Sequence, residues 1–158
     1  MIEAITEKRT PRALIGWRLL ALVYDFFPVL ALWMVASAAF TLGYTFLGHH
    51  ATRENIAPFS ALQWLLWLVC WAIAGLYATI SWRRGGQTLG MRPWRLKVTA
   101  ADGSAPSAKQ LWKRYAMATV SLLAGGLGFW WAWFDGNRLT WHDRFSDTRM
   151  VRLPKKTA

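Results

Sequence analysis

The sequence has few of the residues that build disulfides, metal centres or acidic active sites. A single cysteine, Cys70, among 158 residues leaves no partner for an intrachain disulfide. Two of the three histidines, His49 and His50, are adjacent, but no third ligand accompanies them, so we expect no metal site. No serine, cysteine or carboxylate arrangement typical of a hydrolase occurs in the sequence. We therefore expect neither an enzyme nor a bound cofactor.

Acidic residues are also scarce, and the basic residues that outnumber them are unevenly placed. Nineteen Lys and Arg stand against eight Asp and Glu, which gives a net charge of +11. The basic residues gather at 1–18, 81–114 and 135–158, whereas residues 19–80 hold only Arg53. Such asymmetry follows the positive-inside rule for membrane proteins. It predicts a membrane protein with both termini in the cytoplasm and residues 43–60 outside.

Long apolar runs dominate what is present. Hydrophobic residues make up 54% of the chain, and 12 of them are tryptophan, which is more apolar surface than a small soluble domain can bury. Leu19–Leu42, interrupted only by Asp25, and Ala61–Trp82 each reach the roughly 20 residues that cross a bilayer. The first run is too long for the core of a cleavable signal peptide. The sequence therefore predicts an all-α membrane protein with two transmembrane helices.

A third apolar segment, Tyr115–Phe134, is interrupted near its middle by three glycines. Because glycine permits a sharp turn, this segment either crosses the membrane or enters and returns as a re-entrant hairpin. Two short stretches of alternating polarity, Arg95–Thr99 and Thr148–Leu153, flank it and are expected to pair as a small two-stranded cytoplasmic β element. Pairing would place both ends of the segment on one side, which favours the hairpin over a third span.

Asp25 lies inside the first apolar run, where a bilayer penalises a charge most. Arg18 precedes it by seven residues on the same helix face, about 10 Å away by helical rise. An ionised carboxylate at that depth is costly and must be paired, hydrated or protonated. Two interpretations stay open. Asp25 is part of a proton, cation or solute pathway, or it belongs to a buried ion pair that locks the first helix to the C-terminal region.

The C-terminal region is dense in charged residues that could meet the first helix. Arg114 and Arg138, at the two ends of the third apolar segment, are candidate partners for Asp25 or for Asp143. Asp143 follows His142 directly and could orient an imidazole whose charge changes near neutral pH. We therefore name His142 as a candidate proton relay, with a solvated or lipid-facing charge cluster as the alternative.

The stretch "GGQTLG", from Gly85 to Gly90, has the glycine spacing of a phosphate-binding loop. It continues with Met91 and Arg92, however, so the lysine and hydroxyl that grip phosphate and magnesium are missing. We expect Gly85, Gly86 and Gly90 to form a structural turn at the membrane surface instead.

These residues together resemble the RDD family of bacterial membrane proteins, which takes its name from one arginine and two aspartates. The resemblance rests on three ordered motifs: Arg18 with Ala21 and Asp25; "GQTLG" followed by the strand "RLKV"; and "TWHDRFSDTRMV", with Asp143 as the second aspartate and Thr148 leading the last strand. Met91 stands where the family usually has a basic residue, and Asp147 where it has a small one. The resemblance implies a cytoplasmic-membrane location and a transport role.

The match divides the chain into a flexible basic tail at 1–10, an RDD-like membrane domain at 11–153 and a flexible tail at 154–158. Transport of an ion, proton or small solute through a polar site around Asp25 is the first functional hypothesis. Two spans and a hairpin are too few to enclose a pathway, so a homo-oligomer or a membrane partner is expected. The second hypothesis is a structural or accessory role in which the basic face binds anionic lipid or a partner protein. No nucleic-acid-binding signature is present, so we expect no nucleic-acid partner.

Overall fold

The computed structural model describes residues 13–49 and 56–154 of the chain. The tail expected at 1–10, His50 and residues 155–158 of the expected C-terminal tail lie outside these ranges. The described elements, in chain order, are α1 (Ile15–Leu47), α2 (Ala61–Gly85), β1 (Leu96–Ala100), α3 (Ala108–Leu123), α4 (Leu127–Trp130), a 3₁₀ turn (Trp131–Trp133), α5 (Trp141–Phe145) and β2 (Thr148–Arg152).

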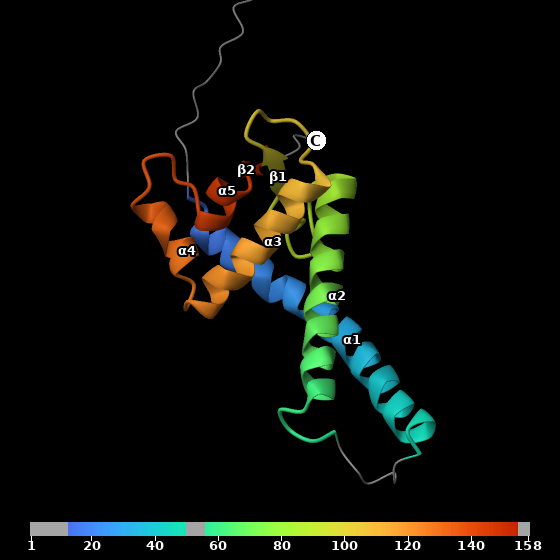
Figure 1. Ribbon diagram of the computed structural model, residues 1–158. Helices are drawn as coiled ribbons and strands as arrows, with labels where there is room; N and C mark the ends of the chain where they lie inside the picture. The colour runs from blue at the N-terminus through green and yellow to red at the C-terminus, as the bar shows by residue number, and fades with distance from the viewer. Residues whose placement is uncertain (1–12, 50–55, 155–158) are drawn as a thin grey trace, which may run out of the picture.

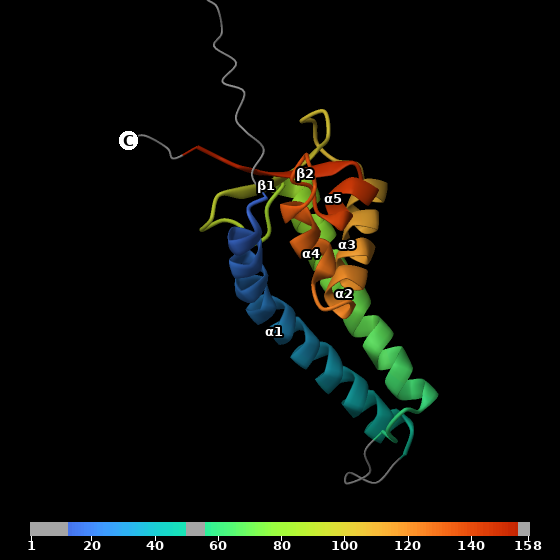
Figure 2. The ribbon, with the colours of Figure 1, turned by 90° about the vertical axis from the view of Figure 1, so that its left-hand side faces the viewer.

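The two longest helices, α1 and α2, are each long and apolar enough to cross a membrane. They cross one another (Figure 1), and their far halves extend beyond the rest of the molecule (Figure 2). Side chains such as Met34 and Val35 remain 65% and 70% exposed, as suits a surface that faces lipid. The indole of Trp33 donates to the Cys70 carbonyl over 2.7 Å and ties the two helices together. The prediction of two helices of spanning length is confirmed.

The third apolar segment is bent sharply at its glycines. α3 and the helical stretch from Leu127 to Trp133 meet at 108°. Gly125 and Gly126 make the bend, with φ angles of 68° and 80° that glycine adopts without strain. α3 packs against α2, where the Tyr115 hydroxyl donates to the Trp71 carbonyl over 2.8 Å. The backbone at the bend is therefore part of a bent helix pair that returns along the molecule (Figure 2).

The two strands pair as the alternating polarity predicts. β1 and β2 are antiparallel, with Leu96 opposite Arg152 and Ala100 opposite Thr148. β1 begins one residue later than expected because Arg95 has a φ of 57° and belongs to the preceding turn. The sheet covers the main core, which gathers side chains from α1, the β1 strand, the loop before it and α3: Ala21, Met91, Leu96, Val98 and Leu111. The chain is therefore mostly helical, with two potential spans and one small sheet.

Candidate functional site

The loop between α2 and β1, residues 86–95, is held against α1 by its glycines and is called the glycine loop below. Gly86 caps the end of α2, and its φ of 73° is the left-handed conformation that a helix-capping glycine adopts readily. Gly90 lies so close to α1 that an added Cβ would contact the Ala21 carbonyl and come within 2.7 Å of the Asp25 nitrogen. Gly85 has open space around its Cα and a helical backbone. The turn thus requires glycine at 86 and at 90, and the structure gives no such reason at Gly85.

Asp25 is held by three neutral donors from α2 and this loop. Its Oδ1 accepts from the Tyr77 hydroxyl over 2.7 Å and from the Gly90 N–H over 2.8 Å. Its Oδ2 accepts from the Thr88 hydroxyl. The Leu89 N–H in turn donates to the Tyr77 oxygen over 3.2 Å, which orients the phenol. Asp25 is half-buried, so these donors replace part of the hydration that the carboxylate loses.

This arrangement differs from one of the two interpretations of Asp25, the ion pair with a group from the C-terminal region. Among the described residues, the ion pairs belong to Arg18, Arg114 and Arg144, and none reaches Asp25. The physical reason is that Arg114 is held by Asp143 and Arg138 by the Trp133 carbonyl. Arg18 is about 10 Å of helical rise away from Asp25, more than a direct salt bridge spans. The glycine loop instead brings the Gly90 N–H within 2.8 Å of Asp25, which forms no ion pair with an arginine in the described part of the chain.

Arg18 instead joins a buried cluster that links three helices. Its Nη1 lies 2.6 Å from Asp143 Oδ2 and 3.1 Å from the Thr140 hydroxyl. Arg114 Nη1 lies 2.5 Å from Asp143 Oδ1 and donates to the Thr148 hydroxyl over 2.7 Å. The three charged residues come from α1, α3 and α5 and are each at most 4% exposed. The cluster therefore fixes α1 to the end of the molecule that carries the sheet.

The charges of this cluster do not balance. Burial alone disfavours the ionised carboxylate, but the guanidinium groups of Arg18 and Arg114 outweigh it and hold the pKa of Asp143 well below its ordinary value. Asp143 is therefore ionised, and it lies between two guanidinium groups, a kind of group that stays protonated in proteins. Two cations face one anion, so the cluster carries a net charge of +1.

The chain matches the model of a known protein family over most of its length. The model of the RDD family matches residues 12–147, most of the chain. The chain belongs to the RDD family. No curated protein and no solved structure matches it. The arginine and the two aspartates of the RDD resemblance, Arg18, Asp25 and Asp143, thus occupy two separate places in the fold.

His142 of this RDD protein is enclosed in an apolar and cationic setting. Its ring lies 4.8 Å from the Phe129 ring, and its Nδ1 has no hydrogen-bond partner among the described residues. Burial, and then the charge of Arg114, lower the pKa of His142 well below 6.5. The lowered pKa disfavours the charged imidazolium that a proton relay at His142 would form. Asp143 directs its oxygens at the arginines, so it does not orient the ring.

The remaining residues predicted for the site lie apart from it. Arg114 takes the second of its two expected partners, Asp143, whereas Arg138 is exposed and donates to the Trp133 carbonyl over 2.7 Å. No group of three His, Cys, Asp or Glu side chains suited to a metal exists in the described part of the RDD chain.

Sequence reasoning missed Tyr77 and Thr88 as partners of Asp25. Thr88 lies inside the "GGQTLG" stretch, which was a usable signal, but nothing in the sequence points to Tyr77.

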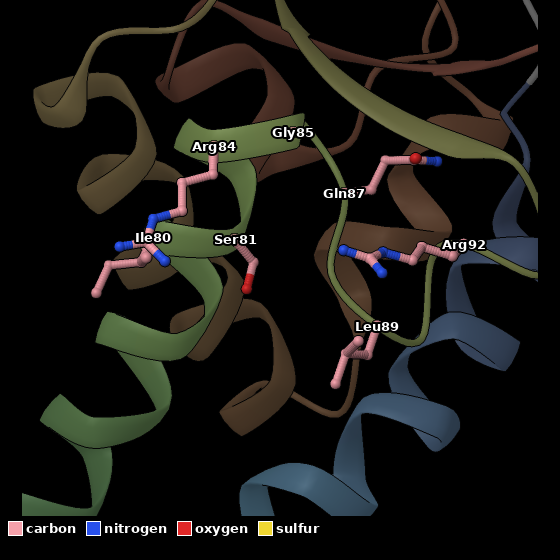
Figure 3. Close-up of a pocket in the computed structure, with 7 residues that line it drawn as sticks. All are labelled: Ile80, Ser81, Arg84, Gly85, Gln87, Leu89 and Arg92. Atoms are coloured by element: carbon pink, nitrogen blue, oxygen red, sulfur yellow. The ribbon is translucent and has the colours of Figure 1, made fainter.

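A pocket of about 290 Å³ opens beside the Asp25 site, between the end of α2 and the glycine loop (Figure 3). Leu89, whose N–H holds the Tyr77 phenol, forms part of its wall. The walls combine two arginines, two uncharged polar residues and two apolar residues: Arg84, Arg92, Ser81, Gln87, Ile80 and Leu89.

Proposed function

We propose that this RDD protein transports a proton, a cation or a small solute across the bacterial cytoplasmic membrane through the polar site at Asp25. The observation that carries the proposal is a carboxylate inside a potential span whose partners are two hydroxyls and one backbone N–H. Neutral donors orient a carboxylate without cancelling its charge. A passing cation or proton can therefore complete the site, whereas an arginine in contact would have occupied it.

The buried cluster of Arg18, Asp143 and Arg114 serves in this proposal as a fixed anchor. Its side chains are buried and hydrogen-bonded from three helices, an arrangement suited to holding geometry. α1 contains both Arg18 of the anchor and Asp25. The anchor therefore fixes the position of α1 along its axis, and with it the position of Asp25 opposite Tyr77 on α2. The glycine loop then closes the site from the other side.

The strand pairing supports the re-entrant hairpin. β1 precedes α3 and β2 follows α5, so their antiparallel pairing returns the chain to the side it left. The 108° bend at Gly125 and Gly126 provides the reversal. Together with the placement of the basic residues, this supports a topology with two spans, a hairpin and both termini in the cytoplasm.

Two spans and a hairpin cannot surround a pathway by themselves, so the transport proposal includes a second copy of the chain or a membrane partner. Apolar side chains of α1 such as Phe27 and Phe46 are 65% and 69% exposed. They offer contact area to a neighbouring helix as well as to lipid.

The experiment that tests transport is flux into vesicles reconstituted with the purified protein. Wild-type protein should move one member of a panel of protons, sodium, potassium and lithium ions. Asp25→Asn keeps the shape of the side chain and removes its charge, so it should abolish flux while the protein still folds and inserts. Asp102→Asn is the matched control, since Asp102 is exposed in a turn and bonds only to Ser104 among the described residues. Flux by Asp25→Asn equal to that of the wild type would remove Asp25 from the mechanism.

A structural or accessory role is the second candidate, and the anchor is the observation that favours it. A protein whose charges only hold helices together needs a static ion network, and the Arg18–Asp143–Arg114 cluster is one. This role predicts no flux from the wild-type protein with any ion of the panel, together with lost stability or assembly in Asp25→Asn.

A further inference from the structure

The pocket between α2 and the glycine loop has two arginines that no carboxylate neutralises within the described residues. The ion pairs among the described residues involve Arg18, Arg114 and Arg144, so Arg84 and Arg92 form none. Both side chains are exposed. Figure 3 shows the Arg92 guanidinium and the Ser81 hydroxyl directed into the space between the helix and the loop. The Arg84 guanidinium instead extends along α2 beside Ile80, so a phosphate held by both arginines requires the exposed Arg84 side chain to turn toward the loop. Guanidinium groups bind phosphate oxygens through paired hydrogen bonds, which makes an anion the fitting occupant.

The loop that forms one wall of the pocket is already fixed in place. The Gln87 amide donates to the Leu96 carbonyl over 2.6 Å and fastens the loop to β1. The Val98 N–H donates to the Gly86 carbonyl over 2.7 Å from the same strand. An anion would therefore enter a preformed wall, which lowers the entropy cost of binding.

The pocket is also amphipathic along α2. Arg84 and Gly85 lie in the last turn of the helix, whereas Ile80 lies one turn further into the apolar span. Ile80 is 45% exposed and Leu89 is 53% exposed, so an apolar surface borders the basic end. A phospholipid has this order of groups, with a phosphate at the interface and hydrocarbon below it. A soluble anion makes no use of the apolar side.

We propose that this pocket binds the phosphate group of an anionic phospholipid, held by Arg84 and Arg92, with the start of an acyl chain against Ile80 and Leu89. The site has a consequence for Asp25. Two of the three donors to its carboxylate, Thr88 and the Gly90 N–H, belong to the loop that forms the pocket wall. A bound lipid would stabilise that loop in the position that serves Asp25.

Lipid binding to the purified full-length protein in detergent tests the proposal, with native mass spectrometry as the readout. The probes are phosphatidylglycerol, phosphatidylcholine and the soluble ester glycerol phosphate. Arg84→Gln and Arg92→Gln should each weaken phosphatidylglycerol binding by about tenfold, the loss expected for one charge-assisted contact. Arg83→Gln is the matched control, because Arg83 is a neighbouring exposed arginine of α2 that does not line the pocket.

Each result separates the pocket from its alternatives. Phosphatidylglycerol binding that depends on Arg84 and Arg92 but not on Arg83, and that exceeds phosphatidylcholine binding, supports the site. Equal weakening by Arg83→Gln would overturn it in favour of diffuse attraction to the basic surface. Glycerol phosphate bound as tightly as the lipid, with the same dependence on Arg84 and Arg92, would overturn the lipid as occupant and assign the pocket to a soluble phosphate ester. No flux is measured, so these results are independent of whether Asp25 carries an ion.

Discussion

Replacement of Asp143 by asparagine is the most direct test of the anchor. The substitution keeps the shape of the side chain and one acceptor oxygen, and it removes the negative charge that Arg18 and Arg114 share. Asp143 is 1% exposed, so water cannot replace the lost charge. Two buried guanidinium groups would then face each other without an anion.

The expected magnitude follows from the burial and from the imbalance of charge. Breaking a buried ion pair by removing one partner costs about 3–5 kcal/mol. Arg18→Gln or Arg114→Gln should cost less, about 1–3 kcal/mol, because either change leaves one arginine opposite Asp143 in a balanced pair. At roughly 2–4 °C per kcal/mol for a chain of this size, Asp143→Asn should lower Tm by about 6–20 °C.

Thermal unfolding in mild detergent, followed by tryptophan fluorescence, measures this difference. The 12 tryptophans give a strong signal, and Trp82 and Trp94 lie against the core beneath the sheet. Asp102→Asn is the control, since an exposed acidic residue in a turn should change stability by less than about 0.5 kcal/mol. The reasoning is refuted if Asp143→Asn unfolds within 1 °C of the wild type, or if either arginine variant is less stable than Asp143→Asn.

Three further predictions address the loop, the buried histidine and the topology. Gly90→Ala should destabilise the protein by about 1–3 kcal/mol in the same unfolding assay, because its Cβ meets the α1 backbone, while Gly85→Ala should change stability by less than about 0.5 kcal/mol. The pKa of His142 is lowered on folding, so the unfolded chain binds more protons below pH 6.5 and stability should fall there by about 1.4 kcal/mol per pH unit. His142→Leu should remove that slope between pH 6.5 and 5; an unchanged slope would show that another group titrates. The topology can be tested with single cysteines placed in a Cys70→Ala background and a maleimide that does not cross membranes. Ala57→Cys should be labelled on intact cells, whereas Gly103→Cys and Pro154→Cys should be labelled only after permeabilisation. Labelling of Pro154→Cys on intact cells, together with Ala57→Cys, would exclude the hairpin.

The long helices and the strand pair can be predicted from the sequence because each leaves a local pattern. About 20 apolar residues in a row suffice for a potential span, and alternating polarity suffices for a strand. The bend at Gly125 and Gly126 is equally local, since the positive φ angles there favour glycine. The start of β1 is less predictable because Arg95 adopts a left-handed φ of 57° that the alternating pattern does not reveal.

The partners of Asp25 could not be predicted because the contacts are tertiary and neutral. Matching by charge directs attention to arginines, whereas the structure supplies the Tyr77 and Thr88 hydroxyls. A tyrosine in an apolar helix has no spacing that marks it as a donor. The close approach of Gly90 to α1 is likewise visible only once the loop is folded. The pairing of Arg114 with Asp143 was accessible, since both lie in the C-terminal half and carry opposite charge.

Arg18 and Asp25 share one face of α1 and still serve different sites, and the separation has an electrostatic consequence. The anchor carries a surplus charge of +1, while Asp25 has no ion-pair partner among the described residues. About 10 Å of helical rise separates Arg18 from Asp25, and two unit charges that far apart attract by roughly 1.5 kcal/mol at an effective dielectric constant of about 20. This attraction is too weak to replace a contacting cation, yet it offsets part of the cost of a carboxylate in the span. The anchor thus contributes to the Asp25 site through its net charge as well as through the position of α1, and an anchor neutralised by a second carboxylate would provide only the position.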